Sequence, residues 1–196
     1  MAELIRNPKI MKRAQKELDD VIGRKRKVEE SDTERLPYLR AVVKEVFRFH
    51  PTVPLLVPHK AESRCEVGGF VIPKNSQLLV NVWAIVRDPT LWDEPTIFMP
   101  ERFIRDDKKI SDIEYMGQHF ELIPFGAGRR MCVGLPLASR MVHLVLASLI
   151  HSFDWAPPNG MNAEKIDMTD KFGLTLKKAV PLYAIPTPRL PSDMYY

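Results

Sequence analysis

The sequence predicts a mainly α-helical fold with small β-sheets, and three observations support that prediction. Apolar residues recur at helical spacing in two segments that each begin with a proline, Pro8 and Pro37. The apolar stretch 136–151 is the strongest helix signal in the chain. Short alternating segments around Gly68 and Gly69 are typical of a β-hairpin, which indicates small sheets rather than one large one.

The N-terminal elements are bounded by clear start and stop signals. Asn7 is a candidate N-cap for the first helix, and Gly23 follows its end. The residues MAELIR before Asn7 look like the tail of another helix. The second helix is expected over residues 37–50, because the prolines that follow it enforce an extended segment. These prolines are Pro51, Pro54 and Pro58.

The remaining elements are shorter. We expect a hairpin over residues 66–72 and a strand that passes into a short helix over 77–86. Residues 87–117 are rich in Pro, Asp and Lys and are predicted to form a long irregular loop. The tail over 172–185 alternates enough for a strand or a hairpin.

Composition sets the broad class of protein. The 196 residues are 45% hydrophobic and 28% charged, an ordinary balance for one globular domain or a large part of one. The net charge of +4 does not call for nucleic acid, and the basic run 24–27 is interpreted as a solvated loop. We see no signal peptide and no run of the roughly 18 apolar residues that a membrane span needs. Two cysteines, Cys65 and Cys132, form neither a disulfide framework nor a zinc-site pattern.

Residues 125–134, FGAGRRMCVG, contain the most informative residue, Cys132. This cysteine lies in a glycine-rich turn, beside two arginines and just before a helix N-terminus, a setting that favours a thiolate. Thiolates act as nucleophiles or as metal ligands. A nucleophile paired with His143 or His151 is conceivable, and a buried inert cysteine is the general alternative. A phosphate-binding loop is disfavoured, because no G-K-[ST] sequence follows the glycines.

Two further motifs are modest when each is taken alone. On a helical wheel, Glu45 and Arg48 fall opposite the apolar face of the second helix. Periodicity therefore predicts a solvated i,i+3 pair that contributes about 0.2–0.5 kcal/mol. The sequence PERF at 100–103 reads as a turn within a loop.

Taken together and in order, these motifs resemble those of the cytochrome P450 family of haem-thiolate monooxygenases. The order is E-x-x-R at Glu45, P-E-R-F at Pro100 and F-x-x-G-x-R-x-C-x-G at Phe125. The resemblance covers essentially the whole chain and is greatest to plant microsomal members, the type that includes geraniol 8-hydroxylases. It implies that the fold is the C-terminal portion of the cytochrome P450 fold.

The resemblance also implies roles for individual residues. Cys132 would be the axial ligand of the haem iron, and Arg130 and His59 would contact the haem propionates. Residues of the same turn would shield the sulfur and tune it, namely Phe125, Gly126, Gly128 and Gly134. Two apolar segments would line the substrate pocket, namely Val53, Pro54, Leu55, Leu56, Phe172, Gly173 and Leu174.

For Glu45 and Arg48 the resemblance contradicts the helical wheel. It implies a buried triad with Arg102 that joins the second helix to the long loop. The two interpretations differ in magnitude, because breaking a buried pair costs about 3–5 kcal/mol. We follow the resemblance here.

The function implied is insertion of one oxygen atom of O₂ into a lipophilic small molecule, such as a plant terpenoid or another secondary metabolite. Electrons would come from NADPH–cytochrome P450 reductase, an acidic partner that Arg129 and Arg140 could face. The implied location is the cytosolic face of the endoplasmic reticulum membrane. The alternatives are a non-catalytic fragment that at most binds haem, and a non-oxygenating relative that rearranges a peroxide.

The chain also departs from the family pattern. Family members are more than twice as long, and two of their parts are not found here: the N-terminal membrane anchor and the central oxygen-activating helix with A-G-x-[DE]-T. Asp32 and Thr33 lie in a polar loop without that glycine. We therefore interpret residues 1–196 as a partial cytochrome P450 domain, whose membrane attachment would depend on the missing anchor. We expect the isolated chain not to run a coupled monooxygenase cycle.

Overall fold

The computed structural model describes residues 1–105, 109–110 and 112–195. The α-helices are α1 (Ala2–Arg6), α2 (Pro8–Val21), α3 (Pro37–Phe49), α4 (Val82–Ile85) and α5 (Leu135–Ser152). Short 3₁₀ helices are η1 (Glu30–Arg35), η2 (Pro100–Phe103), η3 (Gly128–Arg130), η4 (Pro158–Gly160), η5 (Ala163–Lys165) and η6 (Ser192–Tyr195). The strands are β1 (His59–Lys60), β2 (Cys65–Val67), β3 (Phe70–Ile72), β4 (Gln77–Leu78), β5 (Ile104–Arg105), β6 (Lys109–Ile110), β7 (Phe153–Ala156), β8 (Asp170–Lys171), β9 (Lys177–Lys178) and β10 (Ile185–Pro188).

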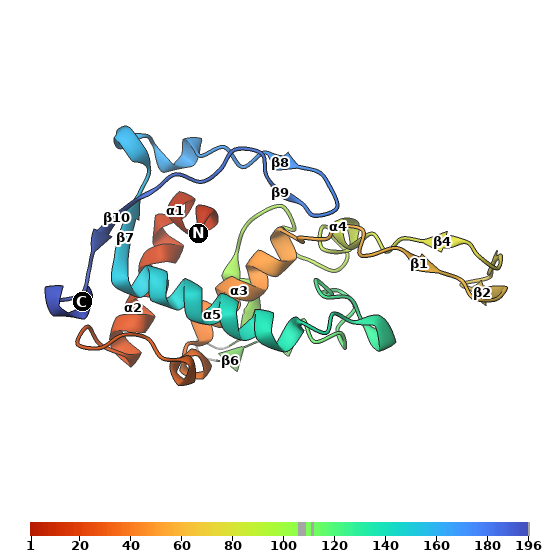
Figure 1. Cartoon of the computed structure of the whole chain (residues 1–196), viewed down its shortest axis with the longest axis horizontal. Coiled ribbons are helices and arrows are strands. Elements are labelled where there is room, and N and C mark those ends of the chain that lie inside the picture. Colours follow the sequence, from red (N-terminus) through yellow and green to blue (C-terminus); the bar gives the residue numbers. More distant parts are fainter. Residues whose placement is uncertain (106–108, 111, 196) are drawn as a thin grey trace.

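Helices α2, α3 and α5 pack against one another and form the body of the molecule (Figure 1). Their facing sides contribute residues that solvent does not reach, including Leu18, Leu39, Val42 and Ile150. Burying each such side chain stabilises the fold by about 1.5–3 kcal/mol before the loss of chain entropy is counted. The mainly helical prediction with small sheets is confirmed, and the core lies between the three longer helices.

The start of α3 is held by a side chain from α2. Pro37 occupies the first turn, where a missing N–H group costs nothing. The Glu17 carboxylate accepts hydrogen bonds from the backbone N–H groups of Tyr38 (2.7 Å) and Leu39 (2.9 Å). These N–H groups have no partner within their own helix, so Glu17 replaces the N-cap that Leu36 cannot provide.

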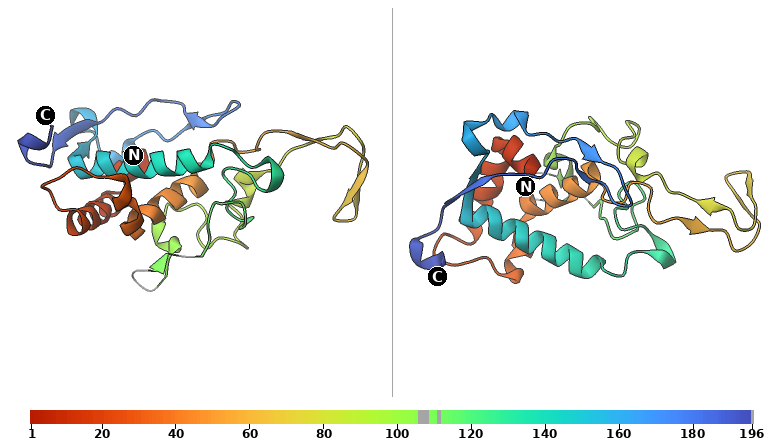
Figure 2. Two further views of the ribbon diagram at one scale, coloured as in Figure 1. Left: turned by 60° about the horizontal axis from the view of Figure 1, so that its bottom comes forward. Right: turned by 45° about the horizontal axis from the view of Figure 1, so that its top comes forward.

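All strand pairs among the described residues are antiparallel and two-stranded. β1 to β4 lie on an arm that projects from the helical body, with the β2–β3 hairpin at its far end (Figures 1 and 2). β10 pairs with β7, so that Ile185 lies opposite Ala156 and Pro188 opposite Phe153. This pairing returns the C-terminal segment to the end of α5.

Two expectations for irregular regions need correction. Within 87–117 the structure contains η2 and the β5–β6 ladder, so this segment is not simply a loop. In the tail, the hairpin is β8–β9, and 172–176 forms its connection instead of a strand. The strand that follows, β10, begins only at Ile185 and pairs outside the tail.

The basic run after α2 is a largely exposed loop, as expected, and two of its arginines form ion pairs. Arg24 contacts Asp19 at 2.6 Å, and Arg26 forms two hydrogen bonds to Asp32, at 2.6 and 2.7 Å. The Asp32 side chain is buried and also accepts from Arg35 and from the backbone N–H group of Glu29. Part of this run therefore closes the loop between α2 and α3.

The far end of α5 is held by Arg189, in the segment after β10. Its guanidinium donates to the carbonyl oxygens of Ile150 (2.9 Å) and His151 (3.0 Å), and it pairs with Asp19 at 3.0 Å. The last carbonyls of a helix lack partners within the helix and carry its negative end, so a buried cation satisfies both needs.

By length and composition alone, α5 is long and apolar enough to cross a membrane, although no such run was expected from the sequence. Core helices of soluble proteins meet the same criterion. α5 packs against α2, α3 and η1, and its residues Ala147, Ile150 and His151 are fully buried.

Candidate functional site

The turn that carries Cys132 is closed by backbone hydrogen bonds. The N–H group of Cys132 donates to the carbonyl oxygen of Phe125 at 2.9 Å, and that of Met131 donates to Gly128 at 3.2 Å. α5 begins three residues after the cysteine, with Gly134 as its N-cap. Cys132 is exposed and not in a disulfide. The thiol therefore lies at the positive end of α5, on a turn whose backbone is fixed.

The glycines of this turn act in two different ways. Gly126 and Gly128 have φ angles of +75° and +68°, which L side chains rarely adopt, so these positions favour glycine for conformational reasons. Gly134 has an ordinary φ of −80°, so its backbone does not require glycine. A Cβ atom at Gly134 would lie 3.7 Å from the sulfur of Cys132, in ordinary contact with it. The expectation of a tight turn thus applies to Gly126 and Gly128, whereas Gly134 leaves space beside the sulfur.

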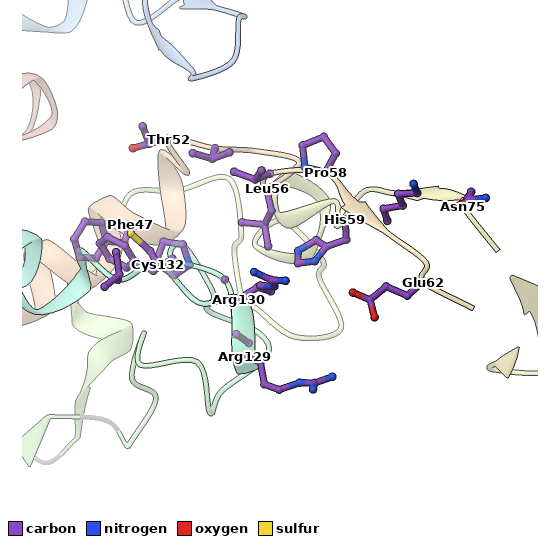
Figure 3. A pocket seen from close by; sticks show the side chains of 18 residues that line it. Phe47, Thr52, Leu56, Pro58, His59, Glu62, Asn75, Arg129, Arg130 and Cys132 are labelled. Atoms are coloured by element: carbon purple, nitrogen blue, oxygen red, sulfur yellow. The ribbon is translucent and has the colours of Figure 1, made fainter. Parts of the chain in front are cut away.

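An open cavity of about 1550 Å³ lies against this turn (Figure 3). It exceeds the roughly 300–1,000 Å³ of typical small-molecule sites, so it could accept a large ligand. Three segments line it, namely the end of α3 with Phe47, residues 52–62, and residues 124–133; Asn75 adds one side chain. Within these segments the lining residues are Thr52, Val53, Leu56, Val57, Pro58, His59, Lys60, Glu62, Pro124, Phe125, Gly126, Ala127, Arg129, Arg130, Cys132 and Val133.

Positive side chains gather on one part of the cavity wall. Arg130 and His59 both line the cavity, and Figure 3 shows Arg129 directed away from Cys132. Within the described residues none of the three forms a hydrogen bond or ion pair, and Lys60 adjoins His59 on β1. Unpaired cations on a concave surface attract an anionic group.

The sequence did not reveal Phe47 as a residue of this site. Its ring packs edge-on against Phe125, with the centroids 5.3 Å apart, and against Tyr115 at 5.0 Å. Phe47 belongs to the apolar face of α3, and the sequence pattern gives such a face no role beyond packing. Because the helix ends at the cavity, that face also forms part of the cavity wall.

The two predicted pocket segments behave differently. In the first, Val53 and Leu56 line the cavity, but Pro54 is buried and neither it nor Leu55 is among the lining residues. Leu56 has a positive φ of 51°, a sparsely populated conformation for this residue. Backbone bonds from Val80 to Leu55 (3.3 Å) and from Trp83 to Pro54 (3.1 Å) hold the segment in place. Pro54 and Leu55 thus hold the segment in place through their carbonyl oxygens, while Val53 and Leu56 line the cavity.

The second segment, Phe172 to Leu174, does not reach the cavity wall. The side chains of Phe172 and Leu174 are 70% and 83% exposed, and Gly173 lies between them in the β8–β9 connection. The connection does approach the first segment, because the N–H group of Leu176 donates to the carbonyl oxygen of Thr52 at 2.7 Å. The prediction that these three residues line the pocket is not met in this structure.

Glu45 and Arg48 are both fully buried, with 0% of each side chain exposed, so the helical-wheel interpretation is wrong. The Arg48 guanidinium donates to both carboxylate oxygens of Glu45, each bond being 2.7 Å long. Its other bonds go to the carbonyl oxygens of Val86 (2.7 Å), Pro95 (2.8 Å) and Ile97 (3.2 Å). A buried charge needs such compensation, and here it is complete.

Arg102 joins the same cluster from η2. Its Nε atom lies 3.2 Å from Glu45, and its side chain is 6% exposed. The remaining donors bind the carbonyl oxygens of Asp93 (2.6 Å), Glu94 (3.1 Å) and Ile97 (3.2 Å). The structure therefore brings Glu45, Arg48 and Arg102 together, and they fix residues 86–102 against α3.

The metal-binding side chains at the cavity suit a metal that is already coordinated by a cofactor, because the described residues there offer one sulfur atom and no cluster of ligands. The described residues contain no group of three His, Cys, Asp or Glu side chains that could hold a metal ion. Cys132 is a lone sulfur donor, beside the apolar side chains of Phe47, Leu56 and Phe125 and the hydrogen-bond donors Arg130 and His59. A flat, acidic metal complex matches all three features, because sulfur binds the metal, apolar side chains bury the ring and the hydrogen-bond donors bind the acids. The residues present thus fit a haem.

The chain belongs to the cytochrome P450 family, a family of haem-thiolate proteins. The family profile described as "Cytochrome P450" matches residues 1–182. This family uses haem iron with a thiolate ligand. The predicted family membership and cofactor class are therefore confirmed.

Several plant proteins are similar to this chain. It is 58% identical over 186 residues to cytochrome P450 76T24 of Catharanthus roseus, which covers 95% of this chain and 36% of that protein. It is 55% identical over 188 residues to geraniol 8-hydroxylase of Swertia mussotii (96% and 37%). It is 52% identical over 195 residues to flavonoid 3′,5′-hydroxylase CYP75B138 of Crocosmia x crocosmiiflora (100% and 37%). The chain thus spans little more than a third of the length of these relatives.

Proposed function

We propose that these residues form the haem-thiolate part of a monooxygenase that hydroxylates a lipophilic small molecule. Cys132 would be the axial ligand, and Arg130 and His59 would bind the acidic groups of the haem. Thiolate-bound haem iron supplies the electron push that favours O–O bond cleavage. The observation that carries the proposal is the single exposed sulfur at the N-terminus of α5, facing a large cavity with unpaired cations.

The chain's own residues would prepare the site in three ways. The fixed turn holds the sulfur in place, and the N-terminus of α5 favours its negative charge. The N–H groups of Val133 and Gly134 have no hydrogen-bond partner within the described part of the chain, so they could donate towards the sulfur. Phe47 and Phe125 would limit access of water from the side of α3.

The substrate and partner follow from the relatives and from the charge of the surface. The names of two relatives specify a terpenoid alcohol and a flavonoid, and Val53, Leu56 and Val57 offer an apolar surface to such molecules. NADPH–cytochrome P450 reductase would supply electrons, and Arg129 and Arg140, both exposed, could face it. The corresponding location is the cytosolic face of the endoplasmic reticulum membrane.

A second candidate function is haem binding without turnover. Cys132 is exposed and Val133 is 97% exposed, so in this chain solvent reaches the sulfur side of the cavity. Closing a site against water prevents side reactions of reactive intermediates. We therefore expect the 196-residue chain by itself to bind haem but not to hydroxylate a substrate.

The test is a spectrum of the full chain after haem is added and the iron is reduced under CO. Ligation by Cys132 predicts a strongly red-shifted Soret band, and Cys132→Ser should abolish this band without unfolding the chain. Cys65→Ser, at the other exposed cysteine, is the matched control and should leave the spectrum unchanged. A red-shifted band that survives Cys132→Ser would refute the assignment of the ligand.

Turnover needs a separate measurement. Reductase, NADPH and a panel of terpenoid alcohols and flavonoids would be supplied to the haem-loaded chain, and NADPH and O₂ consumption would be followed together with product. Haem binding without product formation supports the second function for this chain, whereas substrate-dependent product would overturn it. Product formed from a peroxide without NADPH or O₂ would indicate the non-oxygenating alternative.

A further inference from the structure

A second cavity, of about 460 Å³, lies between α3, α5 and residues 114–116, with η1 along its rim. It shares no lining residue with the cysteine cavity, and Arg140 is the one residue of its wall to which the proposed function also gives a role. Nine of its ten lining residues carry a polar or charged group, and Met116 is the exception. The lining residues are Thr33, Glu34, Arg40, Lys44, Glu114, Tyr115, Met116, Ser139, Arg140 and His143.

Two arginines on this wall are weakly engaged. Arg40 lies 3.8 Å from Glu114, which is near the limit for an ion pair. Arg140 lies 3.5 Å from Glu30, and both of these side chains are mostly exposed. Exposed pairs of this kind contribute about 0–1 kcal/mol, so either arginine can turn to another anion at little cost. Lys44, in contrast, is buried and bound to Glu114 at 2.6 Å.

His143 provides a buried nitrogen at the same cavity. Its side chain is 7% exposed, and Nδ1 lies 2.7 Å from the carbonyl oxygen of Ser139. A carbonyl oxygen only accepts, so Nδ1 carries the proton and, in neutral imidazole, Nε2 carries the lone pair. Nε2 has no partner within the described part of the chain, and it is not among the atoms sealed from solvent. Protonation would turn Nε2 into a charged donor at the cavity.

Hydroxyl groups complete the wall. The oxygen atoms of Tyr115 and Ser139 are 2.7 Å apart, and either can be the donor. Two hydroxyl groups have two protons and need only one for their mutual bond, so one O–H group stays available for another acceptor. The cavity therefore offers neutral and charged donors from three elements.

The acidic residues of the wall do not cancel this charge. Glu114 is bound by Lys44, and its second neighbour is the distant Arg40. Glu34 is exposed on η1, so its carboxylate can stay in water. Two arginines and one protonatable histidine are left to face a bound anion.

We propose that this cavity is a binding site for a tetrahedral oxyanion of the phosphate or sulfate class, held by Arg40, Arg140 and the Nε2 edge of His143. Planar guanidinium groups bind such oxygens in pairs, and a histidine in the cavity wall adds a third direction. The volume leaves room for a small organic group attached to the anion, so a free ion and an ester are both sterically possible. This site is independent of haem and of Cys132.

Binding should depend on pH in a defined direction. Burial lowers the pKa of His143 from its ordinary value of 6.5, and the charges of Arg40 and Lys44 act in the same direction. The hydrogen bond to Ser139 and the charge of Glu114 oppose this shift. The other groups at the cavity are Glu34, Tyr115 and Arg140, and burial raises the pKa of Tyr115, which stays protonated. A bound anion favours protonated His143, so affinity rises as pH falls through the pKa of His143.

The experiment titrates the full chain with sulfate at pH 5 and pH 8, with NaCl added to hold ionic strength constant. Sulfate keeps two negative charges over this range, so the pH dependence reports on the protein. We expect saturable binding at pH 5 in the millimolar range, followed by the ring proton signals of His143 in NMR spectra, and several-fold weaker binding at pH 8, because the lowered pKa of His143 leaves its ring neutral there.

Variants assign the effect to residues. Arg40→Gln should weaken sulfate binding at least tenfold, whereas Arg64→Gln, on the exposed arm, is the matched control and should leave it unchanged. His143→Asn retains a donor for the Ser139 carbonyl but removes Nε2, so it should abolish the pH dependence. Circular dichroism of each variant checks that it folds, and if His143→Asn does not fold, the Arg40 and Arg64 pair decides.

The outcomes are separable. A linear, unsaturable response, or equal losses in Arg40→Gln and Arg64→Gln, would overturn the proposal. Parallel titrations with inorganic phosphate and glycerol phosphate identify the source of the ligand, because tighter binding of the ester indicates a small organic phosphate. A haem spectrum that is unchanged by Arg40→Gln would show that the two cavities act independently.

Discussion

Two charged regions of the molecule differ in how their charges are paired. One is the cluster of Glu45, Arg48 and Arg102, and the other is the turn around Cys132. In the cluster, every Arg48 donor has a protein acceptor and solvent is excluded. In the cysteine turn the sulfur is exposed, and the neighbouring Arg130 has no partner within the described residues. The comparison shows that the protein satisfies the first set of charges itself, whereas the second set is left available for a ligand. The predictions below test this contrast.

The largest effect is expected for Arg48→Ala. It leaves the Glu45 carboxylate buried without its main partner, which should lower the free energy of unfolding by about 3–5 kcal/mol and prevent stable haem incorporation. Urea unfolding and haem content measure these two effects. Arg13→Ala removes a partner from an exposed pair with Glu101 at 2.9 Å and should cost about 1 kcal/mol or less. If the two variants lost equal amounts of unfolding free energy, the buried pair would contribute no more than the exposed one, contrary to this prediction.

A second, smaller effect concerns Asp32, another buried charge that the protein satisfies. Asp32→Asn should lower stability at neutral pH by about 1.5–3 kcal/mol, because it weakens the charge-assisted hydrogen bonds to Arg26. The Arg26 side chain holds the pKa of Asp32 well below its ordinary value of 3.8. A lowered pKa adds stability that is complete above 3.8 and is lost as pH falls through the folded-state pKa.

Urea unfolding of the wild type and Asp32→Asn as a pH series tests this sign. The difference between the two proteins should stay constant above about pH 5 and narrow progressively in more acidic solution. A gap that widens with acid would contradict the assignment of the charge to Asp32.

The third prediction separates the two kinds of glycine in the cysteine turn. Gly128→Ala should cost about 1–2 kcal/mol, because φ is +68° while the added Cβ atom meets nothing within 4 Å. Gly134→Ala has an ordinary φ of −80° and should cost much less, yet it places a methyl group beside the sulfur. Thermal unfolding gives the stability of each variant. The order would have to be revised if Gly134→Ala were the less stable one.

The smallest effect on stability is expected for Arg130→Gln. The side chain is exposed and makes no ion pair in the described residues, so the free energy of unfolding should change by less than about 0.5 kcal/mol. Haem affinity should nevertheless fall several-fold, because an anionic group loses a charged donor. Titration with haem measures this, with Arg64→Gln as the control. An unchanged affinity would remove Arg130 from the cofactor site.

The helices and the cysteine turn could be predicted from the sequence because their determinants are local. Pro8 and Pro37 fix the first turns of α2 and α3, and the glycine pattern around Cys132 marks its turn. The burial of Arg48 could not be predicted from periodicity, because its partners include backbone carbonyls of residues 86–97. Every residue has such a carbonyl, so the amino-acid sequence does not show which ones will bind an arginine. Only the resemblance to a family indicated that burial.

Long-range pairing was missed for a related reason. β7 and β10 are about thirty residues apart, and neither segment alternates strongly enough to identify its partner. Phe47 could not be recognised as a cavity residue, because the apolar face of a helix does not show where along its length a cavity begins. The tip at Phe172 was placed at the pocket by resemblance, and in this structure only the backbone bond from Leu176 to Thr52 links the two segments.

The grip of Arg189 on the last carbonyls of α5 has a practical consequence. α5 starts beside the sulfur of Cys132, and the C-terminal segment binds its other end through Arg189. The Tyr195 hydroxyl also donates to the carbonyl oxygen of Ser152 there. Proteolytic removal of this C-terminal segment would break these hydrogen bonds and destabilise the end of α5. Because α5 begins beside Cys132, such removal would also change the spectrum of a haem bound there.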